Sequence, residues 1–190
     1  MQGMRTGKKL GEDAESEALK ALARGDPSGL ERIYREHKDR LFTVAFHLLG
    51  DEATAEDVLH DVFLHLARHA RELRRPESLR AYLMMCCANR ARDRLRGPRP
   101  APDAGELLAD RPARGPGPEE GLARRDDARR VAAALARLPD EQREVVVLHL
   151  HGQLKFRDIA ELLSNSVNTA QSRYRYALKA LRERLPAEGA

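Results

Sequence analysis

The segment from Gly97 to Gly121 limits what this chain can fold into more than any other stretch. It holds six of the ten prolines and five of the thirteen glycines in the 190 residues, so helix and strand cannot propagate through it. We predict a semi-extended linker over residues 97–123, with a reach of up to roughly 75 Å. The expected units are therefore a disordered tail at 1–11, a domain at 12–96, a second domain at 124–186 and a tail at 187–190.

Both domains are expected to be helical, which makes the fold class all-α. Apolar residues recur at helical spacing, Ala, Leu, Arg and Glu are abundant, and no strand pattern appears. Aromatic residues make up only 4% and Trp is absent, so each domain has a small core. Asp26, Asp51 and Ser166 are placed as N-caps, and Gly50 is placed to end a helix. Helices are expected at 12–24, 27–49, 52–70, 79–96, 124–137, 139–151, 156–163 and 167–185.

Positive charge is concentrated in two stretches, although the net charge is only +4. Five arginines lie within residues 90–99 against Asp93, and five basic residues lie within 167–185 against Glu183. Clustered positive charge on an otherwise balanced chain points to a polyanion, most often nucleic acid. A solvated basic face is the alternative.

The two cysteines, Cys86 and Cys87, are adjacent, so they form no disulfide framework and fit a reducing compartment. We expect both in the core, with Leu83 and Leu95 of the same helix. The N-terminus has no apolar run typical of a signal peptide, and no segment approaches the roughly 20 apolar residues of a membrane span. We therefore expect a cytoplasmic protein without membrane insertion.

The C-terminal stretch has the layout of a helix-turn-helix. A helix of about eight residues is followed by a three-residue turn at Ser164–Ser166 and a longer basic helix. One face of that last helix is apolar, with Val167, Ala170, Tyr174, Ala177, Leu178, Leu181 and Leu185. The other face offers groups that bond to base edges in the major groove, flanked by Arg173 as a phosphate contact. Its members are Asn168, Gln171, Ser172, Arg175 and Lys179.

The stretch from Leu138 to Leu185 resembles the promoter-binding C-terminal domain of sigma-70 family RNA polymerase sigma factors, most closely the small extracytoplasmic-function group. The matching positions include Leu138, Pro139, Arg143, Gly152, Phe156, Ile159, Ala160, Ser166, Val167, Thr169, Ser172 and Arg173. The resemblance implies that the last helix enters the major groove at the −35 element. Carried over by position, the base-facing residues are Gln171, Ser172, Arg175 and Tyr176.

The turn departs from the family pattern, because Ser164 and Asn165 stand where the family usually has Gly and an apolar residue. Asn165 cannot fill an apolar gap between two helices without an unsatisfied amide. We therefore expect a less stable turn and an altered readout.

Residues 25–69 are similar to the other conserved domain of the same family, with matches at Asp26, Tyr34, Leu48, Gly50, Ala55, Val58, Val62, Phe63 and Leu66. The resemblance implies that the polar face of the third helix binds the clamp helices of the polymerase largest subunit, while the C-terminal domain binds the flap. Acidic side chains around an exposed Leu suit a protein contact with a charged rim. That face consists of Glu56, Asp57, His60, Asp61 and Leu64.

Residues 78–96 resemble the next helix of that domain, which in the family works with the preceding loop to capture melted bases of the −10 element. Rings stack on bases and cations hold phosphates in such sites. The residues at these positions are Arg74, Arg75, Glu77, Ser78, Tyr82, Asn89, Arg90 and Arg92, and Arg94 and Arg96 extend the basic row.

Together these features predict a dissociable initiation subunit that is not an enzyme, needs no cofactor and is controlled by an anti-sigma partner. A zinc site is disfavoured, because His65 and His69 with Asp61 lack the Glu of a metalloprotease motif. Two alternatives stay open. One is a helix-turn-helix regulator without a polymerase role, and the other is a degenerate sigma factor with weak promoter binding.

Overall fold

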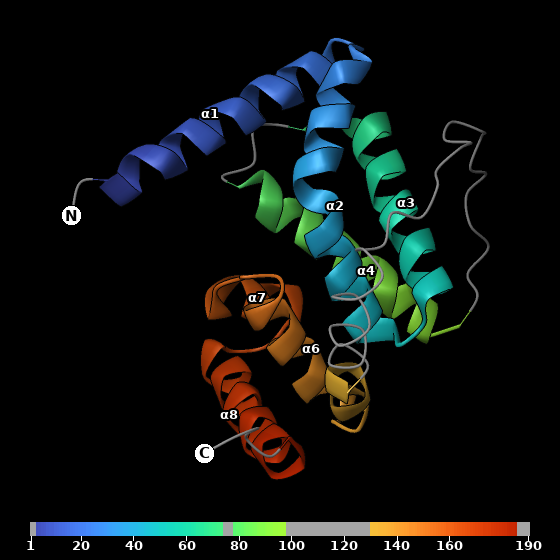
Figure 1. Ribbon diagram of the computed structural model, residues 1–190, viewed down its shortest axis with the longest axis vertical. Helices are drawn as coiled ribbons and strands as arrows, with labels where there is room; N and C mark the ends of the chain where they lie inside the picture. The colour runs from blue at the N-terminus through green and yellow to red at the C-terminus, as the bar shows by residue number, and fades with distance from the viewer. Residues whose placement is uncertain (1–2, 74–77, 98–129, 186–190) are drawn as a thin grey trace, which may run out of the picture.

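The computed structural model describes residues 3–73, 78–97 and 130–185, with side chains described from residue 13. Those residues contain helices and no strand, in agreement with the predicted all-α class. The helices are α1 Gly3–Ala23, α2 Pro27–Leu49, α3 Glu52–His69, α4 Leu79–Leu95, α6 Asp140–Leu150, α7 Phe156–Leu162 and α8 Val167–Arg184, and residues 130–136 are also helical (Figure 1). Most of the predicted linker lies outside the described residues.

Helix α2 is the centre of the N-terminal domain. It contacts α1, α3 and α4, and α3 also packs on α4. Leu41 from α2 and Leu83 from α4 are fully buried in the shared core, and the rings of Tyr34 and Phe63 lie 4.8 Å apart. Figure 1 shows α1 crossing one end of α2 and extending away from the other helices. Burial of these aliphatic side chains is the main stabilising contribution to the domain.

The α1–α2 crossing is close because Gly29 has no side chain. A Cβ at this position would lie 2.4 Å from the carbonyl oxygen of Ala18 and 2.5 Å from the amide nitrogen of Leu22. Both neighbours are backbone atoms, so no side-chain rotation could make room. Only glycine allows the two helices to approach this far.

The predicted caps of this domain are confirmed. The Asp26 carboxylate accepts from the amide of Ser28 at 2.9 Å, and that of Asp51 accepts from the amide of Thr54 at 2.8 Å. Gly50 ends α2 in the left-handed conformation, with φ 76°. These local signals place each helix end within a residue of its expected position.

The C-terminal domain packs α6, α7 and α8 around a small core. Leu148, Leu154 and Ile159 are at most 2% exposed. The rings of His149, Phe156 and Tyr174 form a cluster with centroid distances of 4.2 to 5.3 Å, and His149 Nδ1 lies 2.9 Å from the carbonyl oxygen of Leu154. This cluster joins α6, α7 and α8, and it fixes the first helix of the motif against the last.

Several local predictions are wrong. Helix α1 begins at Gly3 rather than at Glu12, because a glycine inside a helix costs only about 1 kcal/mol and no proline stands before Glu12, so the helix continues through Gly7 and Gly11. Leu95 is 48% exposed, since it is the last residue of α4 and no further turn covers it. Val167 is 39% exposed for the same reason at the start of α8.

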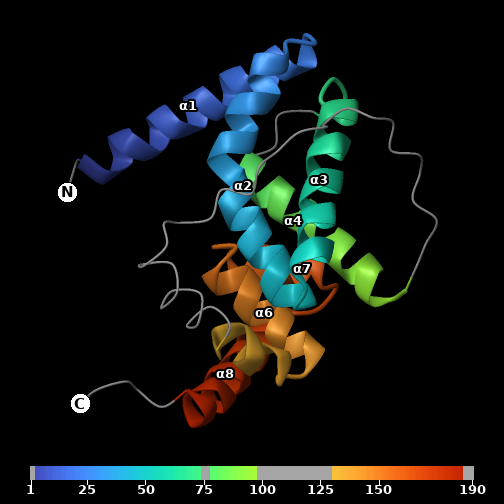
Figure 2. The same ribbon diagram turned by 45° about the vertical axis from the view of Figure 1, so that its right-hand side comes forward.

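The two domains touch. Helix α6 lies against α2, and the rings of His47 and His151 are 4.4 Å apart across the contact. Figures 1 and 2 show the C-terminal domain beside the same end of α2 in both views. No described helix is long and apolar enough to cross a membrane.

Candidate nucleic-acid and polymerase interfaces

The turn of the helix-turn-helix is built by Ser164, Asn165 and Ser166. Ser164 takes the left-handed conformation, with φ 50°, and the amide of Asn165 donates to the carbonyl oxygen of Ala160 at 2.9 Å. Ser166 Oγ accepts from the amide of Thr169 at 3.0 Å, which confirms the predicted cap of α8. The strained residue is therefore Ser164, where the family pattern has glycine.

The expectation of an unsatisfied Asn165 amide is wrong. With its amide group turned to suit its neighbours, Asn165 accepts from Nη1 of Arg173 at 2.8 Å and donates to the carbonyl oxygen of Ser166 at 3.0 Å. The side chain is half-buried. Its polar atoms find partners because an arginine from the next helix reaches the turn.

The predicted reading face of α8 is open to solvent. Tyr176 is 63% exposed, and Asn168, Gln171, Arg175 and Lys179 are also exposed. Ser172 is half-buried, and its Oγ accepts from Arg175 Nη2 at 3.2 Å. Most of these side chains extend from a packed helix into solvent, so base-edge contacts in a major groove are geometrically available.

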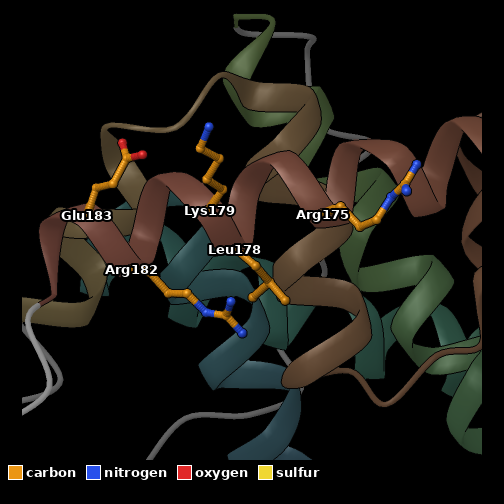
Figure 3. Close-up of a pocket in the computed structure, with 5 residues that line it drawn as sticks. All are labelled: Arg175, Leu178, Lys179, Arg182 and Glu183. Atoms are coloured by element: carbon orange, nitrogen blue, oxygen red, sulfur yellow. The ribbon is translucent and has the colours of Figure 1, made fainter.

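Further along α8 a shallow pocket separates charged side chains (Figure 3). Arg175, Leu178, Lys179, Arg182 and Glu183 line it. Lys179 and Glu183 point to one side of the helix, and Arg182 and Leu178 point to the other. The basic side chains therefore present charge in several directions, as phosphate contacts along a groove require.

Arg173 has a structural contact that the sequence did not suggest. Its guanidinium pairs with Glu141 of α6 at 2.5 Å, and its side chain is only 25% exposed. Together with the Asn165 contact, this pair ties α8 to both α6 and the turn. Arg173 stays a predicted DNA contact, but in this structure it holds the reading helix in place.

The predicted polymerase face of α3 is acidic and partly paired. Glu56 and Asp57 are exposed and His60 is half-buried. Asp61 pairs with Arg94 of α4 at 2.8 Å, and Asp57 lies 3.6 Å from the same guanidinium. Arg94 therefore neutralises part of this face instead of extending a free basic row.

Leu64 is not the exposed centre of that face. It is only 8% exposed, so the prediction of an open leucine is wrong. Helix α3 packs on both α2 and α4, which leaves less of its surface open than one helix in isolation has. Any contact through this face therefore relies on its charged members.

The predicted −10 residues are only partly described. Arg74, Arg75 and Glu77 lie outside the described residues. Among the rest, Ser78 caps α4 by accepting from the amide of Ala81 at 3.2 Å, and Asn89 is exposed.

Tyr82 and Arg90 are half-buried. Burial, with the neighbouring Cys86 thiol, raises the pKa of Tyr82 to about 12. Burial also raises the pKa of Cys87 to about 12, so this thiol is protonated and suited to packing rather than to nucleophilic chemistry.

Arg92, also predicted at the −10 site, faces the other domain. Its Nε lies 2.7 Å from Oε1 of Glu144, and its Nη1 donates to the carbonyl oxygen of Leu162 at 3.3 Å. Arg40 and Arg80 reach the same domain and both donate to Oε1 of Gln153. Sequence reasoning missed these contacts, because the partners are 52 to 113 residues apart and no motif links them.

The structure adds no support for a zinc site at Asp61, His65 and His69. The rings of His65 and His69 lie 4.3 Å apart, and His69 Nδ1 is 3.0 Å from the carbonyl oxygen of His65. In the part of the chain that the structure describes, no three His, Cys, Asp or Glu side chains are grouped to hold a metal ion.

Comparison with known proteins covers both domains. The model of Sigma-70 region 2 matches residues 33–99, and the model of Sigma-70, region 4 matches residues 128–181, together more than half of the chain. The chain is 27% identical over 177 residues to ECF RNA polymerase sigma factor SigK of Mycobacterium bovis, which covers 86% of this chain and 89% of that protein.

Two solved structures share the fold. CnrH in complex with the cytosolic domain of CnrY superposes with a TM-score of 0.67 at 24% identity, over 93% of this chain and 99% of that one. The sigma factor RpoE in complex with the anti-sigma factor NepR from Bartonella quintana gives 0.58 at 20% identity, over 84% and 99%. Both domains of this chain therefore have counterparts in known folds.

Proposed function

Because the chain belongs to the sigma-70 family of RNA polymerase sigma factors, within the extracytoplasmic-function group, we propose that it directs core polymerase to promoters with two separate elements. Helix α8 reads the −35 duplex, and the N-terminal domain binds the melted −10 element. The acidic side of α3 binds the clamp helices of the largest subunit, and the C-terminal domain binds the flap. The chain itself makes no covalent bond, since the polymerase carries out the chemistry.

One observation carries this proposal. The exposed face of α8 presents Gln171, Arg175 and Tyr176 from a helix that is capped at Ser166 and packed through Ala170. The capped, packed helix holds its base-reading groups at fixed positions, as recognition of a defined sequence requires. The acidic face on a different domain supports a second macromolecular partner.

An anti-sigma factor is part of the proposal. RpoE of Bartonella quintana was solved with the anti-sigma factor NepR, and this chain shares its fold. By this proposal a similar inhibitory partner holds the chain away from polymerase until a signal releases it.

The experiment combines the purified chain with sigma-free core polymerase and a promoter library, and counts initiated transcripts. We expect transcripts from a set of related sequences, and steep loss of duplex binding as salt rises, because phosphate neutralisation releases counterions. Gln171→Ala together with Arg175→Ala should abolish selection at the −35 element. Glu183→Ala on the same helix is the control. Duplex binding without any transcript would favour a regulator that does not engage polymerase.

The α3 contact is tested separately by charge reversal. Glu56→Arg should weaken binding to core polymerase, because Glu56 is exposed on the acidic face. Glu36→Arg makes the same charge change at an exposed position of α2 and should leave binding unchanged. Equal effects of the two variants would show that net charge, not α3, decides the affinity.

A further inference from the structure

Arg92 and Glu144 form the central contact between the two domains. Nε of Arg92 lies 2.7 Å from one carboxylate oxygen and Nη2 lies 3.4 Å from the other, while Nη1 donates to the carbonyl oxygen of Leu162. The two side chains are only 17% and 18% exposed. Paired nitrogens of this kind match the two oxygens of a carboxylate or of a phosphate equally well.

Two further arginines reach the C-terminal domain beside this pair. Arg40 Nη1 donates to Oε1 of Gln153 at 3.1 Å, and Arg80 Nη1 donates to the same oxygen at 2.7 Å. Among the described residues no carboxylate pairs with either arginine. Two cations therefore converge on one neutral amide oxygen, a place where an anionic oxygen would bind more strongly.

This closed arrangement is incompatible with binding two promoter elements. The Arg92 guanidinium contacts Leu162, and Leu162 is five residues before Val167, the first residue of α8. Their Cα atoms are thus at most ~19 Å apart. Elements two duplex turns apart are separated by roughly 70 Å. The domains must therefore separate before both can engage one promoter.

We propose that Arg40, Arg80 and Arg92 form a phosphate-binding surface for single-stranded DNA, and that Glu144, Gln153 and the Leu162 carbonyl of the C-terminal domain occupy their guanidinium groups in the free chain. Glu144 and Gln153 occupy the positions of phosphate oxygens in the closed form. The proposal rests on the DNA-binding function given above and adds Arg40 and Arg80 to the strand-binding residues. It also makes domain contact and strand binding mutually exclusive.

Competition of this kind has a defined energetic consequence. DNA binds only the open form, so its apparent affinity falls by the fraction of chains that are open. A variant that weakens the contact on the C-terminal side should raise DNA affinity, although it changes no residue that touches DNA. A variant on the arginine side should open the chain and lower DNA affinity. Substitutions of Glu144 and of Arg92 break the same ion pair, yet they should change DNA affinity in opposite directions. Simple loss of structure would instead lower the affinity in both cases.

The test uses the full chain and two measurements. The radius of gyration from small-angle X-ray scattering reports domain separation, and fluorescence anisotropy of a labelled oligothymidylate reports strand binding. Glu144→Gln and Gln153→Gly weaken the contact. The glycine also suits the φ of 54° at position 153. Losing a hydrogen bond to a charged group should shift the closing equilibrium about ten-fold or more towards the open form.

The matched control is Glu161→Gln, which removes an identical charge from an exposed position of α7 in the same domain. We expect a larger radius and up to about ten-fold tighter strand binding for Glu144→Gln, and neither change for the control. Arg92→Ala should enlarge the radius and weaken strand binding. The proposal is overturned if Glu144→Gln and Gln153→Gly leave the radius unchanged, or if they enlarge it without tightening strand binding.

These measurements also separate a failure of the masking proposal from a failure of the proposed sigma function. Neither measurement contains polymerase, so the masked surface can be established even if the chain supports no transcription with any core enzyme. Conversely, transcripts from the wild-type chain with no effect of Glu144→Gln on radius or strand binding would keep the sigma function and reject the masking.

Discussion

Acidification should destabilise this protein through His47, the histidine buried where α2 meets the C-terminal domain. Its side chain is 8% exposed, its Nδ1 has no hydrogen-bond partner among the described residues, and the His151 ring lies 4.4 Å away. Burial, and secondly the neighbouring His151, lower the pKa of His47 from 6.5 to about 4. The folded chain therefore holds this ring neutral at pH values where the unfolded chain protonates it.

The sign and size follow from proton linkage. Between pH 6.5 and 4 the unfolded state binds a proton that the folded state does not, so the free energy of unfolding falls as the pH falls. The loss is about 2 kcal/mol at pH 5 and reaches about 3 kcal/mol below pH 4. Above pH 7 this contribution to stability is fully present.

The assay is urea unfolding followed by circular dichroism between pH 7.5 and 5, comparing the wild type with His47→Phe. The phenyl ring fills the site and cannot be protonated, so the difference in unfolding free energy between the two proteins should change by about 2 kcal/mol across this range. His151→Phe should keep most of the pH dependence, because burial is the larger cause of the shift. Parallel pH curves for the wild type and His47→Phe would refute the reasoning.

Three backbone positions give further predictions. Gly29→Ala should destabilise the N-terminal domain by about 2 kcal/mol, since the clash with Ala18 and Leu22 outweighs the helix propensity gained. Gly50→Ala, which meets no atom within 4 Å but keeps φ 76°, should cost only about 1 kcal/mol in the same denaturation assay. Ser164→Gly should stabilise the C-terminal domain by about 1 kcal/mol in thermal unfolding, because it relieves a left-handed serine. It should also tighten −35 duplex binding in a gel-shift titration, and an unchanged affinity would show that the turn does not limit recognition.

The helix ends could be predicted from the sequence because each is encoded within a few residues. The carboxylate of Asp26 and the hydroxyl of Ser166 cap amides two and three residues further along, and Gly50 alone can adopt its φ without strain. The exposed face of α8 was predictable for a similar reason, since a period of 3.6 residues separates packed from open positions.

Burial and long-range pairing could not be predicted in this way. Leu64 was placed on an open face because its helical neighbours are charged, yet the packing of α3 against two helices buries it. Arg92 was expected to face DNA because it lies in a basic row, and its partner Glu144 is 52 residues away across the linker. Periodicity reports which side of one helix is apolar, whereas tertiary contacts decide what covers the other sides.

The contact between the domains differs in kind from the contacts within them. Leu41 and Leu83 are completely buried in the N-terminal core, whereas the domain contact combines the buried His47 ring beside His151 with arginines bonded to a carboxylate, an amide and a carbonyl oxygen. Such groups exchange their partners for water or for phosphate at a small net cost, while exposure of an aliphatic core is expensive. Polar contacts of this kind between domains allow relative motion. A polyanion can therefore compete for the arginines and separate the domains without unfolding either one.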